Sequence, residues 1–431
     1  MGTLYERQLE TGGTFATIAI PSFVKSASTT PRNENDMTVR NLHNPNENLR
    51  TLGEDPEAIP PVAPASLSRY QGALLGCALG DAVGAWAERR PASEARDFAA
   101  TLGEFDFDSI GTHHHGMRFG QYTDDTQLSR ELMISLIDEN AFVPEDFADR
   151  VANIFAKDAI VGYGGATQQA AIRLIDGVPW DEAGTPPPRA GNGAAMRAGP
   201  IGLFYYHDVP SCVKAAAEQA IITHKAPLSV AAGVGVAVAT AMALTASDKT
   251  TGPHELGWWS WLAAHVQTNN EEFAQAIRDL AKIVWDGRKK AQWKAGDDAE
   301  FAAAREFVLE GDDASWEGVS PWAKSSTLWA FYCVMAAPRD VWKAITTAIA
   351  VGGDSDTIAA MAATIVGAHI GVENFPKEAL EHVAPVIHDI KAEQWTWEGL
   401  SDLAETLHGI VSAQYAERLA TWEADQTKEE S

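Results

Sequence analysis

Two short acidic clusters bring together side chains that could bind metal ions. They are Tyr122–Thr126 (YTDDT) and Gly352–Thr357 (GGDSDT), and an apolar stretch with helical spacing follows each of them. A helix N-cap would explain one Ser, Thr or Asp in each cluster, since such residues satisfy the free N–H groups of a first turn. Each cluster instead carries two carboxylates as well as hydroxyl groups. If the two helix starts converge, four carboxylates would repel one another unless divalent cations such as Mg²⁺, Mn²⁺ or Ca²⁺ lie among them.

Two glycine-rich segments could approach a ligand with their backbone. Arg189–Arg197 (RAGNGAAMR) places a Gly-Asn-Gly turn before a helix-forming stretch, which exposes N–H groups suited to a phosphate. Gly162–Thr167 (GYGGAT) is a second loop of this type. Ordinary connections look the same, so neither loop predicts a binding site by itself.

The elements that would position these groups are predicted to be helices. From Leu67 onward, apolar side chains recur at helical spacing, and no alternation of strands and helices appears. The fold class is therefore predicted as all-α. The first of these helices carries a glycine at every fourth position: Gly72, Gly76, Gly80 and Gly84. Because an interior glycine costs a helix about 1 kcal/mol relative to alanine, this glycine stripe predicts that another backbone packs closely against it.

The chain is predicted to consist of an N-terminal extension and one large domain. Residues 1–66 are rich in Asn and Pro, apart from the apolar Thr14–Val24, which suits a short strand or a docking peptide. This extension is expected to be partly disordered or to dock on a partner, and a dispensable tail is the alternative. Residues 67–431 form the large domain, in which the polar, charge-mixed segment 286–322 is a candidate insertion.

The charge balance argues against several partners. The 431 residues include 33 Lys and Arg against 59 Asp and Glu, a formal net charge of −26. This excess of acid argues against nucleic acid and anionic membrane surfaces. The uncharged run Ala226–Ser247 is long enough to cross a membrane, but its Ala, Gly, Val and Thr content favours a helix buried in a protein core.

The cysteines and the N-terminal residues bear on the compartment. Cys77, Cys212 and Cys333 form no CxxC pattern, which favours a reducing environment over a disulfide framework. The first residues, MGTLYERQLETGG, lack the basic and apolar regions of a signal peptide. We therefore expect a cytoplasmic protein.

Five blocks of the sequence together resemble the ADP-ribosylglycohydrolase family, which includes the dinitrogenase reductase-activating glycohydrolase and the ADP-ribosyl-acceptor hydrolases. In the order of the family, and from about residue 69 to 376, the blocks are GALLGCALGDAVGAWAE, YTDDTQLSRELM, GNGAAMRAGPIGLF, ITHKAPLS and AVGGDSDTIAAMAATIVGAHIG. The resemblance implies an all-α fold around a binuclear Mg²⁺ or Mn²⁺ centre at the base of an ADP-ribose cleft. It also implies hydrolysis of an N-glycosidic bond that joins ADP-ribose to a macromolecule, with protein arginine as the favoured acceptor.

The resemblance assigns metal ligands to the two acidic clusters. One ion would be bound by four residues, Thr123, Asp124, Asp125 and Asp356. The other would be bound by three, Asp354, Asp356 and Thr357, so that Asp356 bridges the two ions.

Further residues would act on the substrate. Glu88 matches a mobile acidic residue of the family, and a surface glutamate is the alternative. Glu88, Asp124 or Asp125 would accept a proton from the attacking water, and the sequence does not choose among them. The diphosphate and distal ribose would contact Gly164, Asn192, Gly193 and His224, although a core histidine is the alternative for the last of these.

Two conspicuous features favour ordinary explanations. The run His113–His115 suits a loop better than a metal site, since adjacent residues rarely converge on one ion. Trp258, Trp259 and Trp261 could stack on adenine, but tryptophans are more often part of a core.

Two other functions compete with the hydrolase. A non-catalytic ADP-ribose-binding module is one, but it would not need a complete set of metal ligands. The other is an immunity protein that neutralises an ADP-ribosyltransferase toxin, partly by blocking it through the extension at 1–66. The expected partners are therefore an ADP-ribosylated protein and, for the immunity function, a toxin.

Overall fold

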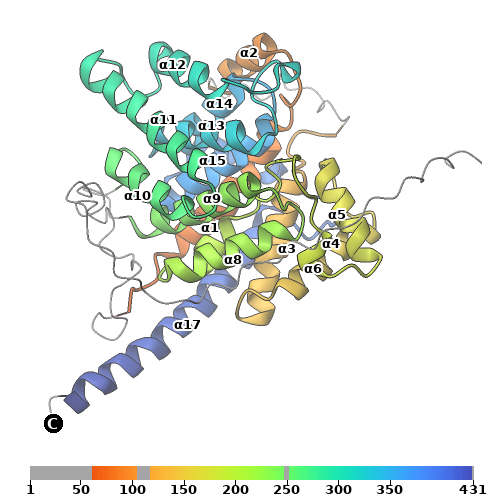
Figure 1. Ribbon diagram of the computed structural model, residues 1–431, viewed down its shortest axis with the longest axis vertical. Helices are drawn as coiled ribbons and strands as arrows, with labels where there is room; N and C mark the ends of the chain where they lie inside the picture. The colour runs from red at the N-terminus through yellow and green to blue at the C-terminus, as the bar shows by residue number, and fades with distance from the viewer. Residues whose placement is uncertain (1–60, 104–116, 247–251, 430–431) are drawn as a thin grey trace, which may run out of the picture. The chain divides into compact units, whose positions relative to one another are not determined.

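The computed structural model describes residues 61–103, 117–246 and 252–429, and its regular elements are helices (Figure 1). Within these ranges the β-structure consists of isolated bridges, such as the one between Val319 and Gly353. This confirms the predicted all-α class. In chain order the α-helices are α1 (Leu67–Gly84), α2 (Ala92–Gly103), α3 (Asp124–Glu139), α4 (Pro144–Ala156), α5 (Gly165–Ile175), α6 (Trp180–Ala183), α7 (Gly199–Phe204), α8 (Val209–Ile221), α9 (Pro227–Thr245), α10 (Leu256–Val266), α11 (Glu271–Lys290), α12 (Asp298–Val308), α13 (Ala323–Ala336), α14 (Val341–Ala350), α15 (Ser355–Ile370), α16 (Lys377–His382) and α17 (Trp397–Glu429). Three short 3₁₀ helices are η1 (Ala314–Trp316), η2 (Val372–Asn374) and η3 (Ala384–Val386).

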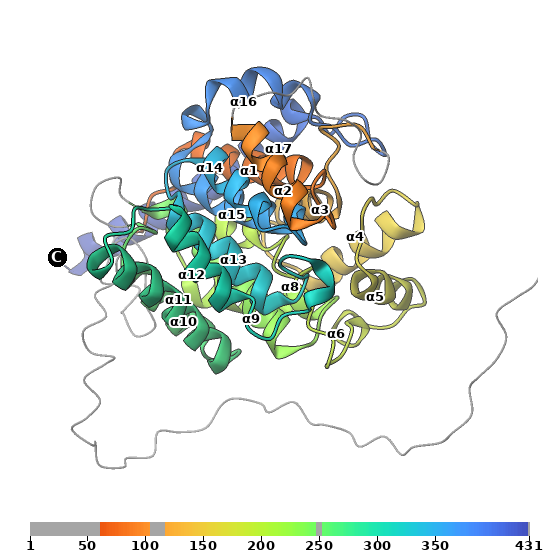
Figure 2. The same ribbon diagram turned by 90° about the horizontal axis from the view of Figure 1, so that it is seen from above.

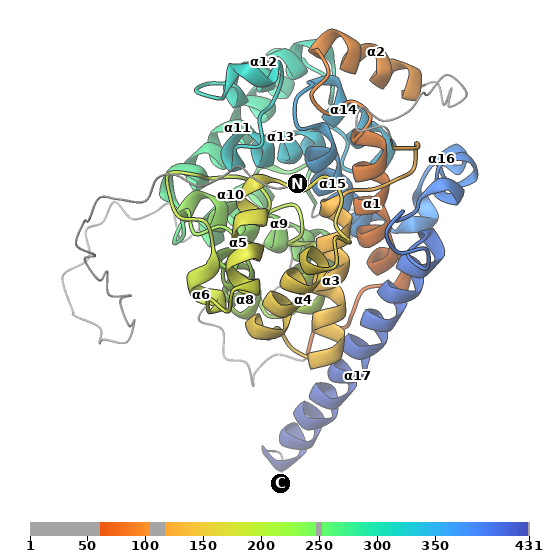
Figure 3. The same cartoon turned by 90° about the vertical axis from the view of Figure 1, so that its right-hand side faces the viewer.

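Helices α1 and α15 lie side by side and run antiparallel (Figure 3). The glycine stripe of α1 faces α15, and a methyl group on any of its four glycines would overlap backbone atoms of that helix. The carbonyl groups it would meet belong to Gly367, Ala363, Ala359 and Ser355. The predicted close approach of another backbone is therefore confirmed, and it brings the start of α15 to the end of α1.

The apolar run at 226–247 forms the core helix α9. It is the one helix of the described residues that is long and apolar enough to cross a membrane, yet 94% of its most apolar window is buried inside the protein. Helix α10 packs nearby, and Trp258 and Trp259 on it are buried, with Trp259 against Phe331 of α13. Both the core helix and the core position of these tryptophans agree with the sequence predictions.

Several predicted features lie outside the described residues. They include Thr14–Val24 and His113–His115. Of the extension at 1–66, only residues 61–66 are described, and there the Tyr206 hydroxyl donates to the Val62 carbonyl at 2.9 Å. The domain boundary therefore stays a prediction.

The segment proposed as an insertion, 286–322, contains the end of α11, all of α12 and η1. Arg288 and the buried Glu300 form an ion pair within it, at 2.6 Å between Nε and Oε2. In the view of Figure 2, α11 and α12 lie at one edge of the helices, on the side away from α4. The segment thus folds as part of the described helices, and whether it is an insertion stays a prediction.

Candidate active site

A cavity of about 520 Å³ contains most of the residues predicted to carry chemistry. Its wall comes from the segment after α1, the start of α3, the loop into α5 and the loop before α7. His224 after α8, η1 and the start of α15 complete it. The predicted residues on its wall are Glu88, Asp124, Asp125, Gly164, Asn192, Gly193, His224, Asp354, Asp356 and Thr357. The remaining one, Thr123, does not line the cavity but is buried, and its hydroxyl oxygen lies 3.2 Å from Oδ2 of Asp125.

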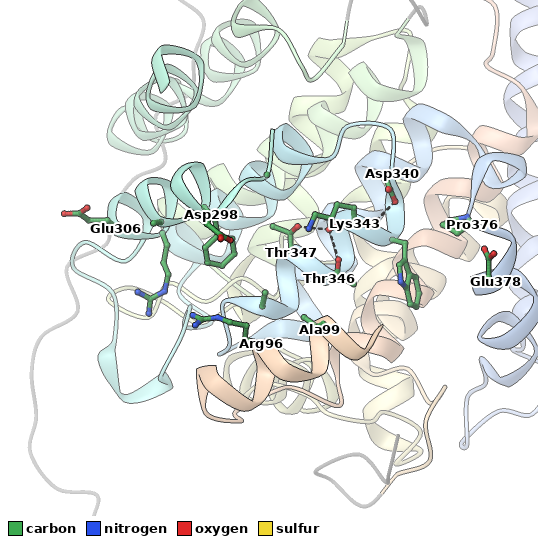
Figure 4. Close-up of a pocket in the computed structure, with 17 residues that line it drawn as sticks. Arg96, Ala99, Asp298, Glu306, Asp340, Lys343, Thr346, Thr347, Pro376 and Glu378 are labelled. Atoms are coloured by element: carbon green, nitrogen blue, oxygen red, sulfur yellow. Dashed lines mark hydrogen bonds between the residues drawn. The ribbon is translucent and has the colours of Figure 1, made fainter. Parts of the chain in front are cut away.

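A larger cavity of about 1210 Å³ lies between α2, α12 and α14 (Figure 4). Its lining includes cations such as Arg96 and Lys343, and also acidic residues. Of these acids, Asp340 is the N-cap of α14, and Glu306 directs its side chain away from the cavity (Figure 4). It contains none of the predicted site residues, so the predicted chemistry belongs to the smaller cavity.

The acidic start of α15 is held against α1 by the last glycine of the stripe. The Ser355 hydroxyl donates to the Gly84 carbonyl at 2.8 Å, and a side chain on Gly84 would overlap the backbone of α15. Gly353 has φ +88°, and a side chain there would overlap the backbone of Val319. This close approach allows the Asp354 N–H to donate to the Val319 carbonyl at 2.8 Å. The glycines of GGDSDT thus fix the bend that leads into the helix.

Asp81, a residue of α1 with no predicted role, fixes the start of α3. Its buried carboxylate accepts the N–H and hydroxyl of Thr123 at 2.8–3.0 Å, and those of Thr126 at 2.6–3.0 Å. Burial raises the pKa of Asp81 to about 6, although these hydrogen bonds oppose the rise. Because both oxygens already accept hydrogen bonds, we interpret Asp81 as the cap of α3 rather than as a metal ligand.

Helix capping does not explain the two acidic clusters. The N-cap residue of α3 is Thr123 and that of α15 is Asp354, and neither side chain makes a capping hydrogen bond. In α3 the cap comes from another helix. The carboxylates of Asp124 and Asp125 are therefore not required to satisfy the first turn of α3. In α15, Oδ1 of Asp356 accepts the N–H of Thr357 at 2.8 Å, which leaves the Asp354 carboxylate outside the cap.

Asp356 belongs to two groups of carboxylates. Its oxygens lie within 4.8 Å of those of Asp81 and Asp125 on one side, and of Glu88 and Asp354 on the other. The Oδ1 atom of Asp125 is buried and has no hydrogen-bond partner in the described part of the chain. An orphaned carboxylate oxygen beside other carboxylates is what an oxygen-binding divalent cation would satisfy.

Burial and mutual repulsion raise the pKa values of these carboxyl groups. Burial raises the pKa of Asp354 to about 7, with a further contribution from the charge of Glu88. The pKa values of Asp124, Asp125 and Asp356 are also raised, first by burial and then by neighbouring carboxylates. A cation among them would relieve this repulsion, so the residues fit a metal centre.

The two glycine-rich loops meet the acidic clusters. Asn192 is buried, and its side-chain amide donates to Oδ2 of Asp354 at 2.6 Å. Gly162 has φ +78°, and a side chain there would press against Thr123. Nothing lies within 4 Å of the position that a side chain on Gly164 would take, so its backbone is open to the cavity.

Glu88 follows α1 and lies with the carboxylates. Its side chain is 14% exposed, and it shares the group with Asp354 and Asp356, which argues against a surface glutamate. The next residue, Arg89, has φ +57°, and its guanidinium lies over the Trp316 ring at 3.8 Å. Both Arg89 and Trp316 line the cavity.

Asp81, Arg89 and Trp316 are the site residues that sequence reasoning missed. Asp81 is the one acidic residue of the glycine-striped helix, and this was a usable signal, since a buried acid needs a partner. Trp316 carried no signal, because it comes from a polar segment far from the motifs in sequence.

Comparisons with known proteins bear on this cavity. The sequence model described as ADP-ribosylglycohydrolase matches residues 63–418. The chain is 29% identical to "ADP-ribosylhydrolase ARH3" of Homo sapiens, over 73% of this chain and 89% of that protein. It is 26% identical to "ADP-ribosylarginine hydrolase Tri1" of Pseudomonas putida, over 76% of this chain and 78% of that protein. A solved structure, "ADP-ribosylglycohydrolase-related protein complex", matches with a TM-score of 0.53 and 25% identity, over 80% of this chain and 98% of that one.

Proposed function

The chain belongs to the ADP-ribosylglycohydrolase family, and we propose that it is a metal-dependent hydrolase that removes ADP-ribose from arginine on a modified protein. Membership of the family supports ADP-ribosyl hydrolase activity. The acceptor, the metal and its stoichiometry are the parts that the proposal adds.

One observation carries the proposal. Asp356 lies close to Asp125 and also to Glu88 and Asp354, and these four carboxylates line a cavity that two glycine-rich loops also line. A module that only bound ADP-ribose would need the loops but not the buried, mutually repelling carboxylates, because burying such charges without a cation is unfavourable.

The donor set suits two Mg²⁺ or Mn²⁺ ions. The residues that would hold them are Thr123, Asp124, Asp125, Asp354, Asp356 and Thr357. Bound there, the ions would supply Lewis-acid chemistry to the ribose hydroxyl groups and to the attacking water.

The protein's own groups then perform three tasks. The loops around Gly164 and Asn192 would hold the ligand by backbone N–H groups and the Asn192 side chain. Carboxylates near the ribose would stabilise the positive charge that develops as the glycosidic bond breaks. One of Glu88, Asp124 and Asp125 would accept the proton of the attacking water.

The arginine acceptor is supported by one named relative. Tri1 of Pseudomonas putida is described as an ADP-ribosylarginine hydrolase, and it matches 76% of this chain. The name of the more similar human relative states no acceptor. Serine-linked ADP-ribose is therefore the comparison that any test must include.

The test is release of labelled ADP-ribose from two protein substrates, one modified on arginine and one on serine. We expect release from the arginine-linked substrate in the presence of Mg²⁺ or Mn²⁺, and its loss when EDTA is added. Release from the serine-linked substrate alone would contradict the acceptor, and release that EDTA does not reduce would contradict the metal requirement.

A further inference from the structure

We propose that Arg197 and Thr223 are positioning residues that hold His224 as a hydrogen-bond donor, through its Nε2–H, toward a ligand in the cavity. The identity of that ligand, ADP-ribose, rests on the proposed function. The orientation of the imidazole rests on the hydrogen bonds around it.

Arg197 is a fully buried cation that meets neutral acceptors. Its Nε donates to Gln219 Oε1 at 3.0 Å, and Nη1 donates to the Gly193 carbonyl at 2.7 Å. Its Nη2 donates to the Gln219 carbonyl at 3.0 Å and to the Thr223 hydroxyl at 2.7 Å. In the described residues none of these acceptors is a carboxylate. A buried charge without an ionic partner is costly to fold, which favours a role in the site.

The hydroxyl of Thr223 links Arg197 to His224, because it contacts both side chains. A guanidinium only donates, so the bond from Arg197 occupies a lone pair of the Thr223 oxygen. The same oxygen lies 2.8 Å from Nδ1 of His224. Among the described residues, Nδ1 is the one acceptor found for the Thr223 hydroxyl proton. A neutral imidazole that accepts this proton at Nδ1 carries its own proton on Nε2.

The imidazole is held neutral. Burial, together with the smaller effect of the nearby Arg197 charge, lowers the pKa of His224 to about 3. The neutral ring of His224 therefore carries one N–H proton, and the hydrogen bond from Thr223 to Nδ1 keeps that proton on Nε2.

The Nε2 atom of His224 is open to the cavity. His224 lines it, and no hydrogen bond from Nε2 is found in the described part of the chain. Gly191 and Gly193 flank this atom, and a side-chain carbon on either would lie 3.3–3.4 Å from it. Their lack of side chains leaves Nε2–H free to reach a phosphate or ribose oxygen.

Two measurements on the full chain test this arrangement. Nitrogen-15 NMR of labelled histidines, with His224→Gln for assignment, reports which ring nitrogen carries the proton. Calorimetry with ADP-ribose and Mg²⁺ reports the affinity. The variants are Thr223→Val, which keeps the shape and removes the hydroxyl, and Thr223→Ser, which restores it. Thr347→Val is the matched control, because that buried hydroxyl donates to the Lys343 carbonyl within its own helix, α14.

We expect the Nε2–H tautomer in the unaltered protein and in Thr347→Val. Thr223→Val should lose the single tautomer and bind ADP-ribose about tenfold more weakly, and Thr223→Ser should restore both properties. An Nδ1–H tautomer in the unaltered protein, or unchanged tautomer and affinity in Thr223→Val, would overturn the proposal. Failure of the unaltered protein to bind ADP-ribose would instead contradict the proposed function, while the tautomer would still decide the role of Thr223.

Discussion

The side-chain amide of Asn192 donates a 2.6 Å hydrogen bond to Oδ2 of Asp354, and both residues are buried. This bond joins the Gly-Asn-Gly loop to the acidic start of α15. A residue expected to contact the ligand therefore also orients a residue expected to bind metal. It also opposes the rise in the pKa of Asp354 that burial and Glu88 cause.

Replacing Asn192 should consequently impair metal binding as well as hydrolysis. In Asn192→Ala the Asp354 carboxylate loses its donor, and in Asn192→Asp it gains a repelling charge. We expect a loss of about 10–100-fold in activity at limiting metal, larger for Asp than for Ala, as is typical of groups that orient metal ligands. Asn374→Ala, at an exposed position away from the cavity, is the control. Unchanged metal dependence in both Asn192 variants would show that the bond has no such role.

The contact between α1 and α15 makes a clear prediction for stability. Gly80→Ala should lower the free energy of unfolding by about 1–3 kcal/mol, because its methyl group would overlap the Ala359 carbonyl and neither backbone can move freely. Gly409→Ala is the matched control in α17, where nothing lies within 4 Å, and it should raise stability by about 0.5–1 kcal/mol. Urea unfolding of both variants measures this. Equal effects of the two substitutions would show that the stripe is loosely packed.

The pH dependence of stability should contain a contribution from His224. Its folded pKa of about 3 lies below the unfolded value of 6.5, so between these values the unfolded chain binds more protons. This contribution is complete above pH 6.5 and is lost as the pH falls, by about 2 kcal/mol between pH 6.5 and 5. His224→Gln should therefore lose less stability than the unaltered protein over this interval. Parallel unfolding curves for the two proteins would show that His224 titrates normally.

Removal of residues 1–60 should leave the hydrolase intact. The cut retains Val62 and Ala65, whose carbonyls contact Tyr206 and His408. We expect the shortened chain to bind metal and to hydrolyse ADP-ribosylarginine as the full chain does. Under the immunity hypothesis it should bind a cognate ADP-ribosyltransferase more weakly. Loss of both metal binding and small-substrate hydrolysis would instead make the extension part of the catalytic fold.

Short sequence motifs predicted most residues of this site, because its acidic side chains are close together in sequence. YTDDT and GGDSDT each place their acids within one helix start. The glycine stripe predicts a closely packed partner, because close packing explains why the helix repeats the cost of glycine. The stripe did not identify α15 as that partner. Nothing in the local sequence states which helix lies opposite.

The contributions that the sequence did not reveal are those made across the fold. Asp81 caps a helix that begins 43 residues later, at Asp124, and this required knowing that α1 passes the start of α3. Trp316 contacts Arg89 from the segment 286–322, whose polar, charge-mixed composition predicted an insertion and no site residue. The chain of hydrogen bonds from Arg197 through Thr223 to His224 depends on the direction of each bond, which residue types alone do not give.

The shared position of Asp356 is the centre of this account, and calorimetric titration of Asp356→Ala with Mn²⁺ tests it most directly. Asp138→Ala is the control, because that carboxylate pairs with Arg150 at 2.7 Å outside the cavity. We predict that the unaltered protein and Asp138→Ala bind two ions per chain and release ADP-ribose, whereas Asp356→Ala binds fewer ions and releases none. Unchanged stoichiometry in a folded Asp356→Ala protein would contradict the two-metal site.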